Sequence, residues 1–364
     1  MSGTTGKKNL RLVAAVVIIV IVIGASGLAY YYYSSSTSTS PTSSSLMSTT
    51  TPSSPLILYS ADAYVAESTV LENAFTNSTG IMMAPPKSAG SLLLAHEIAE
   101  GNPVSVFISV SRSAVTPEHL GNESSGWAIA FASDQMAIAY ANVSLQNSAA
   151  SAAVAAYKSA VASNTTAAWN NFFSMITSGS VKVGISNPNA DPAGYRGWIV
   201  LEAAGQAYAN ASSFFENRML SNNGNVTASS AADLVGPLET GQIQFLFIYK
   251  SAAIAHKLNY LQLPDQVNLG NPKYAKFYSK FSYQLANGVE KGGVIALFIT
   301  VPADSTDTTD SLQFVVFVVK NSPTLLASYG LIPLTPARLY NSTTIPQPLQ
   351  ELVTQGYLQP SGPL

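Results

Sequence analysis

Cysteine is absent from the 364 residues of the chain. Its absence excludes disulfide bonds, thiolate catalysis and cysteine-ligated zinc or iron–sulfur sites. It also excludes a lipoprotein anchor, because such an anchor is attached to a cysteine. The compartment stays open, since many exported proteins have no disulfide bond.

Charged residues are scarce as well, at 10% of the chain, against roughly 25% in an average globular protein. The formal net charge is −2 and there is no long basic run, so we do not expect nucleic acid as a partner. A surface built from Ser, Thr, Ala and Asn changes little when carboxylates become protonated. We therefore hypothesise an acidic habitat.

Histidine is rare, and the sequence has no common catalytic motif. The segment from His96 to Glu100 begins like H-E-x-x-H, but its fifth residue is glutamate, so a metalloprotease is not indicated. No G-x-S-x-G elbow, P-loop or G-x-G-x-x-G is present. An enzyme is the least favoured class, and we expect neither a catalytic residue, a metal site nor a cofactor.

The N-terminus carries an export signal of unusual length. Lys7, Lys8 and Arg11 precede an uncharged apolar run over residues 12–33. A bilayer span needs about 20 apolar residues, whereas a signal-peptide core has roughly 7–15. The length favours a single-pass anchor at the cell membrane, with a cytoplasmic stub over 1–11 and the rest extracellular. A cleaved signal, giving a secreted protein, is the alternative, because Gly24–Gly27 supply small residues.

Residues 34–54 are rich in Ser and Thr and cannot bury a core, so they are expected to form a flexible stalk. Acceptor sequons follow, which together indicate a glycosylated surface protein. They lie at Asn77, Asn122, Asn142, Asn164, Asn210, Asn225 and Asn341.

From residue 56 onward, apolar runs of strand length alternate with helical patterns, which predicts an α/β fold. Strands are expected at 56–59, 104–110, 127–131, 135–140, 181–185, 244–249 and 294–301, and helices at 66–75, 91–100, 149–162, 192–208 and 252–258. The strands 127–131 and 135–140 are expected to pair with each other. The apolar run 311–320 fits a helix or a strand.

The segment from Ser186 to Arg196 (S-N-P-N-A-D-P-A-G-Y-R) follows a strand and opens a helix. Asp191 is a good N-cap, and Pro192 suits the first helical turn. Gly194 lets a ligand approach the backbone closely. Free N–H groups at a helix N-terminus bind anions, although an ordinary capped helix remains an equally good interpretation.

A second loop, Ser88 to Ser91, also opens a helix, and Ser91 offers a hydroxyl and an N–H group. Taken alone, a simple N-cap is the commoner explanation of such a serine. Two such helix starts that face each other would enclose one oxyanion without Lys or Arg.

Two further stretches, 247–253 (F-I-Y-K-S-A-A) and 261–269 (L-Q-L-P-D-Q-V-N-L), closely resemble the archaeal molybdate/tungstate-binding proteins of ABC importers. The segment 186–196 resembles that family's S-N-P-N-D-D-P-C-G-Y-R signature. Residues 277–288 and 329–334 fit as well, so the resemblance covers the chain from about residue 56 to its C-terminus.

The resemblance implies a type II periplasmic-binding-protein fold with two hinged lobes, each a mixed sheet flanked by helices. The first lobe would comprise 55–135, the second 136–254, and the return to the first 255–364. The anion would lie in the cleft between the lobes, and closure would signal to the transporter. The implied partners are molybdate or tungstate and an ABC permease with its ATPase, and we expect a monomer.

The resemblance also implies site residues. The family's helix-start serine matches Ser91, its aspartate matches Asp191, and tyrosines at the same pocket match Tyr195 and Tyr249. Together with Gly194, these residues form the predicted oxyanion site.

Three departures from the family pattern bear on the ligand. Ala63 stands where the family has an oxyanion-binding serine, Ala231 where it has a second acidic residue, and Ala190 where it has the first aspartate of D-D-P. They favour a plain four-oxygen anion held by hydrogen bonds. Asp62, if ionised, would repel this anion, so it must point away or be protonated in acid. The departures also keep an alternative open, a surface protein of the same fold that binds a sulfate-like oxyanion or no longer serves transport.

Overall fold

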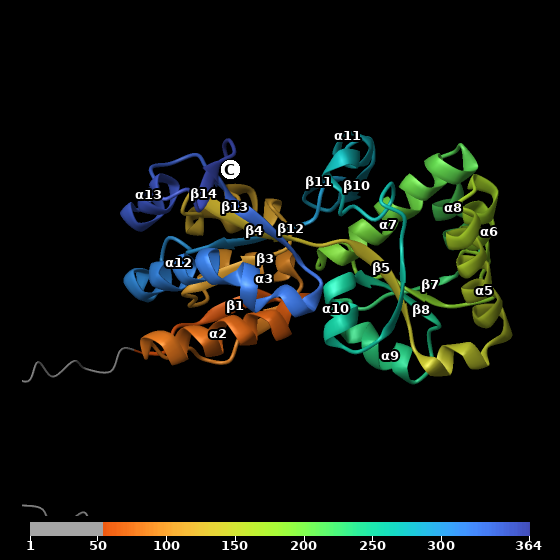
Figure 1. The fold of residues 1–364 in the computed structure, drawn as a ribbon, viewed down its shortest axis with the longest axis horizontal. Helices are drawn as coiled ribbons and strands as arrows, with labels where there is room; N and C mark the ends of the chain where they lie inside the picture. Colours follow the sequence, from red (N-terminus) through yellow and green to blue (C-terminus); the bar gives the residue numbers. More distant parts are fainter. Residues whose placement is uncertain (1–53) are drawn as a thin grey trace, which may run out of the picture. The chain divides into compact units, whose positions relative to one another are not determined.

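The computed structural model describes residues 54–364, which belong to one compact unit running from Ser53 to Leu364. This unit consists of two α/β lobes, each with its own sheet (Figure 1). The predicted anchor and nearly all of the predicted stalk lie outside the described residues. Within residues 54–364, no helix is both long enough and apolar enough to span a bilayer.

The first lobe is built on a mixed, seven-stranded sheet of order β14-β13-β4-β12-β3-β1-β2. β1 is parallel to β2 and β3, whereas β12 is antiparallel to β3 and β4. The strands are β1 (Leu58–Ala61), β2 (Lys87–Ala89), β3 (Val106–Ser109), β4 (Trp127–Ser133), β12 (Ala296–Thr300), β13 (Ile332–Asn341) and β14 (Leu358–Pro360).

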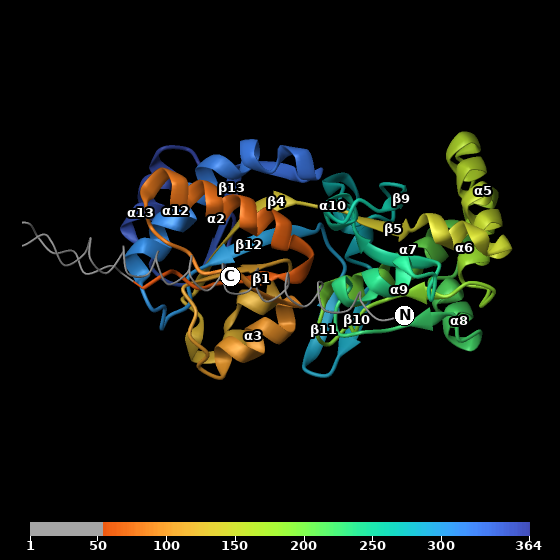
Figure 2. The ribbon, with the colours of Figure 1, turned by 90° about the horizontal axis from the view of Figure 1, so that it is seen from below.

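Helices cover both faces of this sheet. α3 lies on one side, and α2 and α12 lie on the other (Figure 2). The ambiguous run 311–320 belongs to a helix, because its buried residues recur at helical spacing, and the ring of Phe314 packs edge-on against Phe75 of α2 at 5.1 Å. The helices are α2 (Val65–Thr79), α3 (Ser91–Ala99), α4 (Pro117–Leu120), α12 (Thr308–Leu325) and α13 (Gln347–Thr354).

The second lobe has a five-stranded sheet of order β7-β6-β8-β5-β9. Its strands are β5 (Met136–Tyr140), β6 (Val183–Gly184), β7 (Asn225–Val226), β8 (Phe245–Tyr249) and β9 (Asn259–Gln262). Its helices are α5 (Ser148–Ser163), α6 (Thr166–Ile176), α7 (Pro192–Ala204), α8 (Phe214–Ser221), α9 (Val235–Glu239) and α10 (Lys250–Ala255). A short helix α11 (Ala275–Tyr278) and the hairpin of β10 (Ser282–Leu285) and β11 (Gly288–Lys291) follow.

Two expectations about connectivity are wrong. β4 and β5 do not pair with each other, because β4 lies in the first sheet and β5 in the second. The local pattern identifies a strand but not its partner, and here each strand pairs with a strand distant in sequence. The return to the first lobe also comes later than residue 254, since β9 pairs with β5 and keeps the chain in the second lobe until Gln262.

The crossing between β4 and β5 forms a hinge around Asp134, which is buried. Its Oδ2 accepts hydrogen bonds from the Tyr64 hydroxyl of the first lobe at 3.0 Å and from the Ser251 hydroxyl of the second lobe at 2.6 Å. The N–H of Met136 donates to the carbonyl of Asn268 at 2.7 Å, so the outgoing and returning segments lie side by side. One carboxylate thus joins both lobes at the hinge.

Two glutamates of α2 are buried in the first lobe. Glu67 is only 1% exposed, and neither of its carboxylate oxygens has a hydrogen-bond partner among the described residues. Burial raises the pKa of Glu67 to about 7, and that of Glu72 to about 7 as well. The folded protein therefore binds more protons than the unfolded chain between the ordinary glutamate pKa and pH 7, so its stability falls as the pH rises through this window.

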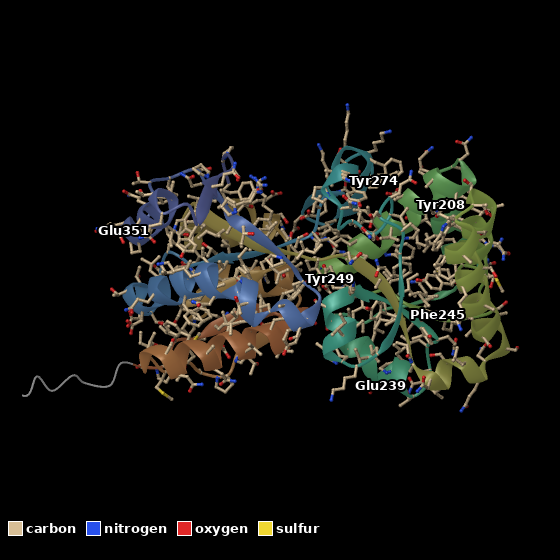
Figure 3. The ribbon with its side chains drawn as sticks, in the orientation of Figure 1. Tyr208, Glu239, Phe245, Tyr249, Tyr274 and Glu351 are labelled. Atoms are coloured by element: carbon tan, nitrogen blue, oxygen red, sulfur yellow. The ribbon has the colours of Figure 1, made fainter. Side chains whose placement is uncertain are left out.

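We predict that Glu67→Gln raises the free energy of unfolding at pH 8 by about 1–3 kcal/mol, because the amide needs no proton to be neutral. At pH 4 we expect little change, since Glu67 is then protonated in both states. Urea unfolding at the two pH values measures the difference. Glu239→Gln is the control, because Glu239 is exposed on α9 (Figure 3). An equal effect of Glu67→Gln at both pH values would contradict the prediction.

Candidate functional site

Asp191 is the N-cap of α7 and is 2% exposed. Its Oδ1 accepts a hydrogen bond from the N–H of Ala193 at 3.0 Å, and its Oδ2 accepts one from the N–H of Ala231 at 2.8 Å. The carboxylate therefore links the first turn of α7 to the loop before α9. Both oxygens are occupied by donors, so the ionised group itself has no proton to give to an anion.

Ser91 is the first residue of α3, with Gly90 as the N-cap, and it is fully buried. Its Oγ accepts a hydrogen bond from the N–H of Val110, which follows β3, at 3.1 Å. The hydroxyl proton is left free to point elsewhere. Ser91 thus lies where the resemblance implies an anion-binding serine, at the N-terminus of a helix.

The starts of α3 and α7 meet across the two lobes. A Cβ added to Gly90 would lie 2.2 Å from the carbonyl oxygen of Ala190 and 2.9 Å from Cα of Asp191. The N–H of Leu93 donates to the same Ala190 carbonyl at 3.4 Å. Only glycine permits so close an approach. The two lobes are therefore closed onto each other at this point.

Gly194 lies in the first turn of α7, where a Cβ would be 2.3 Å from the carbonyl oxygen of Ser186. The close approach that the sequence predicted at this glycine is made by the protein's own backbone. Packing of α7 on the preceding loop thus accounts for the glycine, and its part in anion binding stays a prediction.

Tyr195 and Tyr249 are buried around a third side chain, that of Arg196. The Nη1 of Arg196 donates to the Tyr249 hydroxyl at 2.6 Å, and its Nη2 donates to the carbonyl of Val110 in the first lobe at 2.7 Å. Its guanidinium carbon lies 5.3 Å and 5.6 Å from the centroids of the Tyr195 and Tyr249 rings. Figure 3 shows Tyr249 at the junction of the lobes. The arginine holds both tyrosines and also bridges the cleft.

Asp62 directly follows β1, and its Oδ1 accepts a hydrogen bond from the N–H of Ala63 at 2.8 Å. Its Oδ2 is buried without a hydrogen-bond partner among the described residues. Burial, together with the neighbouring Asp191 carboxylate, raises the pKa of Asp62 to about 7. Asp62 therefore lies close to Asp191 and does not point away from the second lobe, and the rise of its pKa is in the direction that protonation requires.

Sequence reasoning did not single out Arg196 as a site residue and gave Asp62 no role. A signal for both exists in hindsight. In a chain with 10% charged residues, a charge directly after a buried strand or in the first two turns of a buried helix is conspicuous. Such charges are rarely buried without a partner or a ligand.

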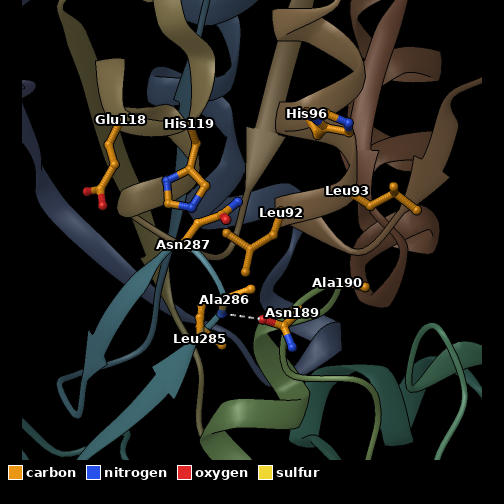
Figure 4. A pocket seen from close by; sticks show the side chains of 10 residues that line it. All are labelled: Leu92, Leu93, His96, Glu118, His119, Asn189, Ala190, Leu285, Ala286 and Asn287. Atoms are coloured by element: carbon orange, nitrogen blue, oxygen red, sulfur yellow. Dashed lines mark hydrogen bonds between the residues drawn. The ribbon is translucent and has the colours of Figure 1, made fainter.

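Two cavities border the closed cleft. One, of about 330 Å³, lies between α3 and α4 of the first lobe and the β10–β11 hairpin (Figure 4). The Asn189 Oδ1 accepts a hydrogen bond from the N–H of Ala286 at 2.8 Å in its wall. Its lining is Leu92, Leu93, His96, Glu118, His119, Asn189, Ala190, Leu285, Ala286 and Asn287. The other, of about 770 Å³, borders Tyr195 and Arg196 and also includes Arg112, Lys291 and Arg338.

The sequence has recognisable relatives. Residues 56–327 match the family model described as bacterial extracellular solute-binding protein. A solute-binding protein of Sulfurisphaera tokodaii is 38% identical over 319 residues, which cover 85% of this chain and 84% of the relative. A solute-binding protein of Saccharolobus solfataricus is 36% identical and covers 85% and 78%.

Solved structures share the fold at low sequence identity. The periplasmic molybdate-binding protein of Azotobacter vinelandii superimposes with a TM-score of 0.54 at 14% identity, covering 76% of this chain and 98% of the other. The sulfate-binding protein SubI of Mycobacterium tuberculosis gives 0.51 at 14% identity, covering 85% and 92%. Both likenesses establish a two-lobed fold of the periplasmic-binding-protein kind. From the family match and the two archaeal relatives, the chain belongs to the extracellular solute-binding proteins of the ABC-transporter type.

Proposed function

We propose that the protein captures a tetrahedral oxyanion, molybdate or tungstate, and delivers it to an ABC importer. The observation that carries the proposal is the meeting of the α3 and α7 starts across the two lobes. Each helix N-terminus presents backbone N–H groups and a positive dipole end, and two of them at one point suit a small anion. The fold is shared with a molybdate-binding and a sulfate-binding protein.

Each predicted residue has a distinct part in this proposal. Ser91 donates its hydroxyl proton and its N–H to the anion. Asp191 orients the first turn of α7 and the Ala231 loop through its two hydrogen bonds. Arg196, with Tyr195 and Tyr249 packed on it, supplies a buried positive charge close to the cleft. In a closed, dehydrated cleft these dipoles and this charge act more strongly than in water.

The finer details of the cell biology belong to the same proposal. The type II arrangement would close around Asp134, and the closed form would be what the permease and its ATPase recognise. Residues 12–33 would anchor the protein in the membrane, with the lobes outside. The sequon asparagines Asn77, Asn122, Asn142, Asn164 and Asn210 are exposed, and Asn225 and Asn341 are half-buried, so the first five are the expected glycosylation sites.

The first test is calorimetric titration of the full-length protein in detergent with tungstate, molybdate and sulfate at pH 5.5 and 7.5. We expect molybdate and tungstate to bind at least tenfold more tightly than sulfate, as the resemblance to molybdate/tungstate-binding proteins implies. Ser91→Ala should weaken binding about tenfold, which corresponds to about 1.4 kcal/mol. Ser88→Ala is the control, since Ser88 is exposed on β2. Absence of binding for both molybdate and tungstate would sink the proposal, even if sulfate binds.

A second prediction concerns closure. Gly90→Ala should weaken oxyanion binding by tenfold or more, because the new methyl group meets the Ala190 carbonyl in the closed form. The backbone at Gly90 has φ −58° and ψ 140°, which alanine adopts freely, so the melting temperature should change little. Gly236→Ala is the matched control, because a Cβ there meets nothing within 4 Å. Equal affinities of the two variants would show that the Gly90 contact is not needed for capture.

The larger cavity favours one other candidate, an organic anion. Its volume of about 770 Å³ far exceeds the needs of a four-oxygen anion. Four cationic side chains border it, against two carboxylates, and these six are Arg112, Arg196, Lys291, Arg338, Glu118 and Glu290. Citrate and a sugar phosphate therefore belong in the titration panel. Tight binding of either, without binding of tungstate or molybdate, would make that cavity the solute site.

A further inference from the structure

Asp62 has no part in the proposed function so far, yet it lies close to Asp191 and Ser230 of the second lobe. It lies at the carboxyl end of β1, in the 3₁₀ turn Asp62–Tyr64. Oδ1 is engaged with the N–H of Ala63, which orients the carboxyl group. Oδ2 is the free atom, buried and without a hydrogen-bond partner among residues 54–364. A buried oxygen of this kind costs free energy unless a ligand or a proton satisfies it.

The surroundings of Asp62 are acidic. The carboxylate of Asp191, at the start of α7, raises the pKa of Asp62 more than any other charge does, and Asp233, in the turn before α9, raises it less. The Ser230 hydroxyl lowers the pKa of Asp62, although it makes no hydrogen bond of normal geometry to Oδ2. The positive charge of Arg196 lowers the pKa of Asp191 and so partly offsets the effect of burial on that group. Burial raises the pKa of both Asp62 and Asp191.

These charges are incompatible with an anion unless a proton is added. Two ionised carboxylates beside a dianion in a dehydrated cleft repel one another strongly. Asp191 is the better place for the negative charge, because its two oxygens accept N–H donors. Asp62 Oδ2, which accepts nothing, is the natural place for the proton.

We propose that Asp62 is protonated in the closed cleft and that its Oδ2–H donates a hydrogen bond to an oxygen of the bound oxyanion. The carboxylic acid would thereby replace the hydroxyl that is missing at Ala63, the next residue. This inference rests on the proposed function. It adds a ligand-binding residue and states the condition under which that residue binds, because the donor exists only when the carboxyl group carries its proton.

Proton uptake on capture follows directly. In an open cleft the carboxyl group of Asp62 faces water and is ionised at neutral pH, whereas in the closed, loaded cleft it holds a proton. Affinity is then constant in acid, falls as the pH rises from the ordinary aspartate pKa towards the raised one, and is constant again above it. The fall approaches tenfold per pH unit within this window, because one proton is taken up per anion.

The experiment is titration of the full-length protein with micromolar molybdate between pH 5.5 and 8, in buffers of different ionisation enthalpy. For the unaltered protein we expect affinity to fall by roughly tenfold per pH unit across this range, with close to one proton taken up at pH 6, because the bound anion raises the pKa of Asp62 further. Asp62→Asn keeps a donor at every pH, so its affinity should be independent of pH and higher than that of the unaltered protein at pH 7.5. Asp62→Ala lacks the donor and should bind weakly throughout.

Asp233→Asn is the matched control, because Asp233 is an exposed neighbour of the pair, and it should keep the pH dependence. Circular dichroism verifies that each variant is folded. Molybdate binding without proton uptake, or with an unchanged slope in Asp62→Asn, overturns the inference and leaves the proposed function intact. Absence of both molybdate and tungstate binding at every pH overturns the proposed function, and the inference falls with it.

Discussion

The guanidinium of Arg196 holds the cleft together. It reaches from α7 of the second lobe to the carbonyl of Val110 in the first, and it fixes the hydroxyl of Tyr249 on the way. Within residues 54–364 the ion pairs are Lys87 with Glu97 and His96 with Glu100, so no carboxylate lies within salt-bridge distance of this buried cation. Carbonyl and hydroxyl dipoles solvate it instead. A buried positive charge of this kind attracts an anion into the cleft.

A second constraint is the burial of carboxyl groups in a chain that has few charges. Burial raises the pKa of Glu67, Glu72 and Glu202 to about 7 and that of Asp134 to about 6. All of these shifts have the same sign, so the folded protein gains stability as the pH falls towards the ordinary carboxyl pKa. The hypothesis of an acidic habitat, drawn from composition, thus acquires a structural basis in particular groups.

Much of the architecture could be predicted from local signals. Asp191 and Pro192 predicted the start of α7, and apolar runs predicted β1, β3, β8 and β12. These signals are local, because capping and burial depend on a few neighbouring residues. Pairing could not be predicted, since β4 and β5 are neighbours in sequence but belong to different sheets. The approach of Asp62 to Asp191 could not be predicted from the sequence either, because it depends on closure of the two lobes. Gly194 shows a further limit, since glycine marks a close approach without saying what approaches.

One short turn connects the cleft with the hinge. The residues Asp62–Tyr64 form a single 3₁₀ turn after β1. Its first side chain lies in the cleft beside Asp191, whereas its last donates a hydrogen bond to the hinge residue Asp134 and packs its ring 5.5 Å from that of Tyr249. Only Ala63 separates them in the turn. The carboxyl group that we propose for binding and the carboxyl group that joins the lobes are therefore connected by one short turn and one hydrogen bond, a direct route by which a change at Asp62 would reach the hinge.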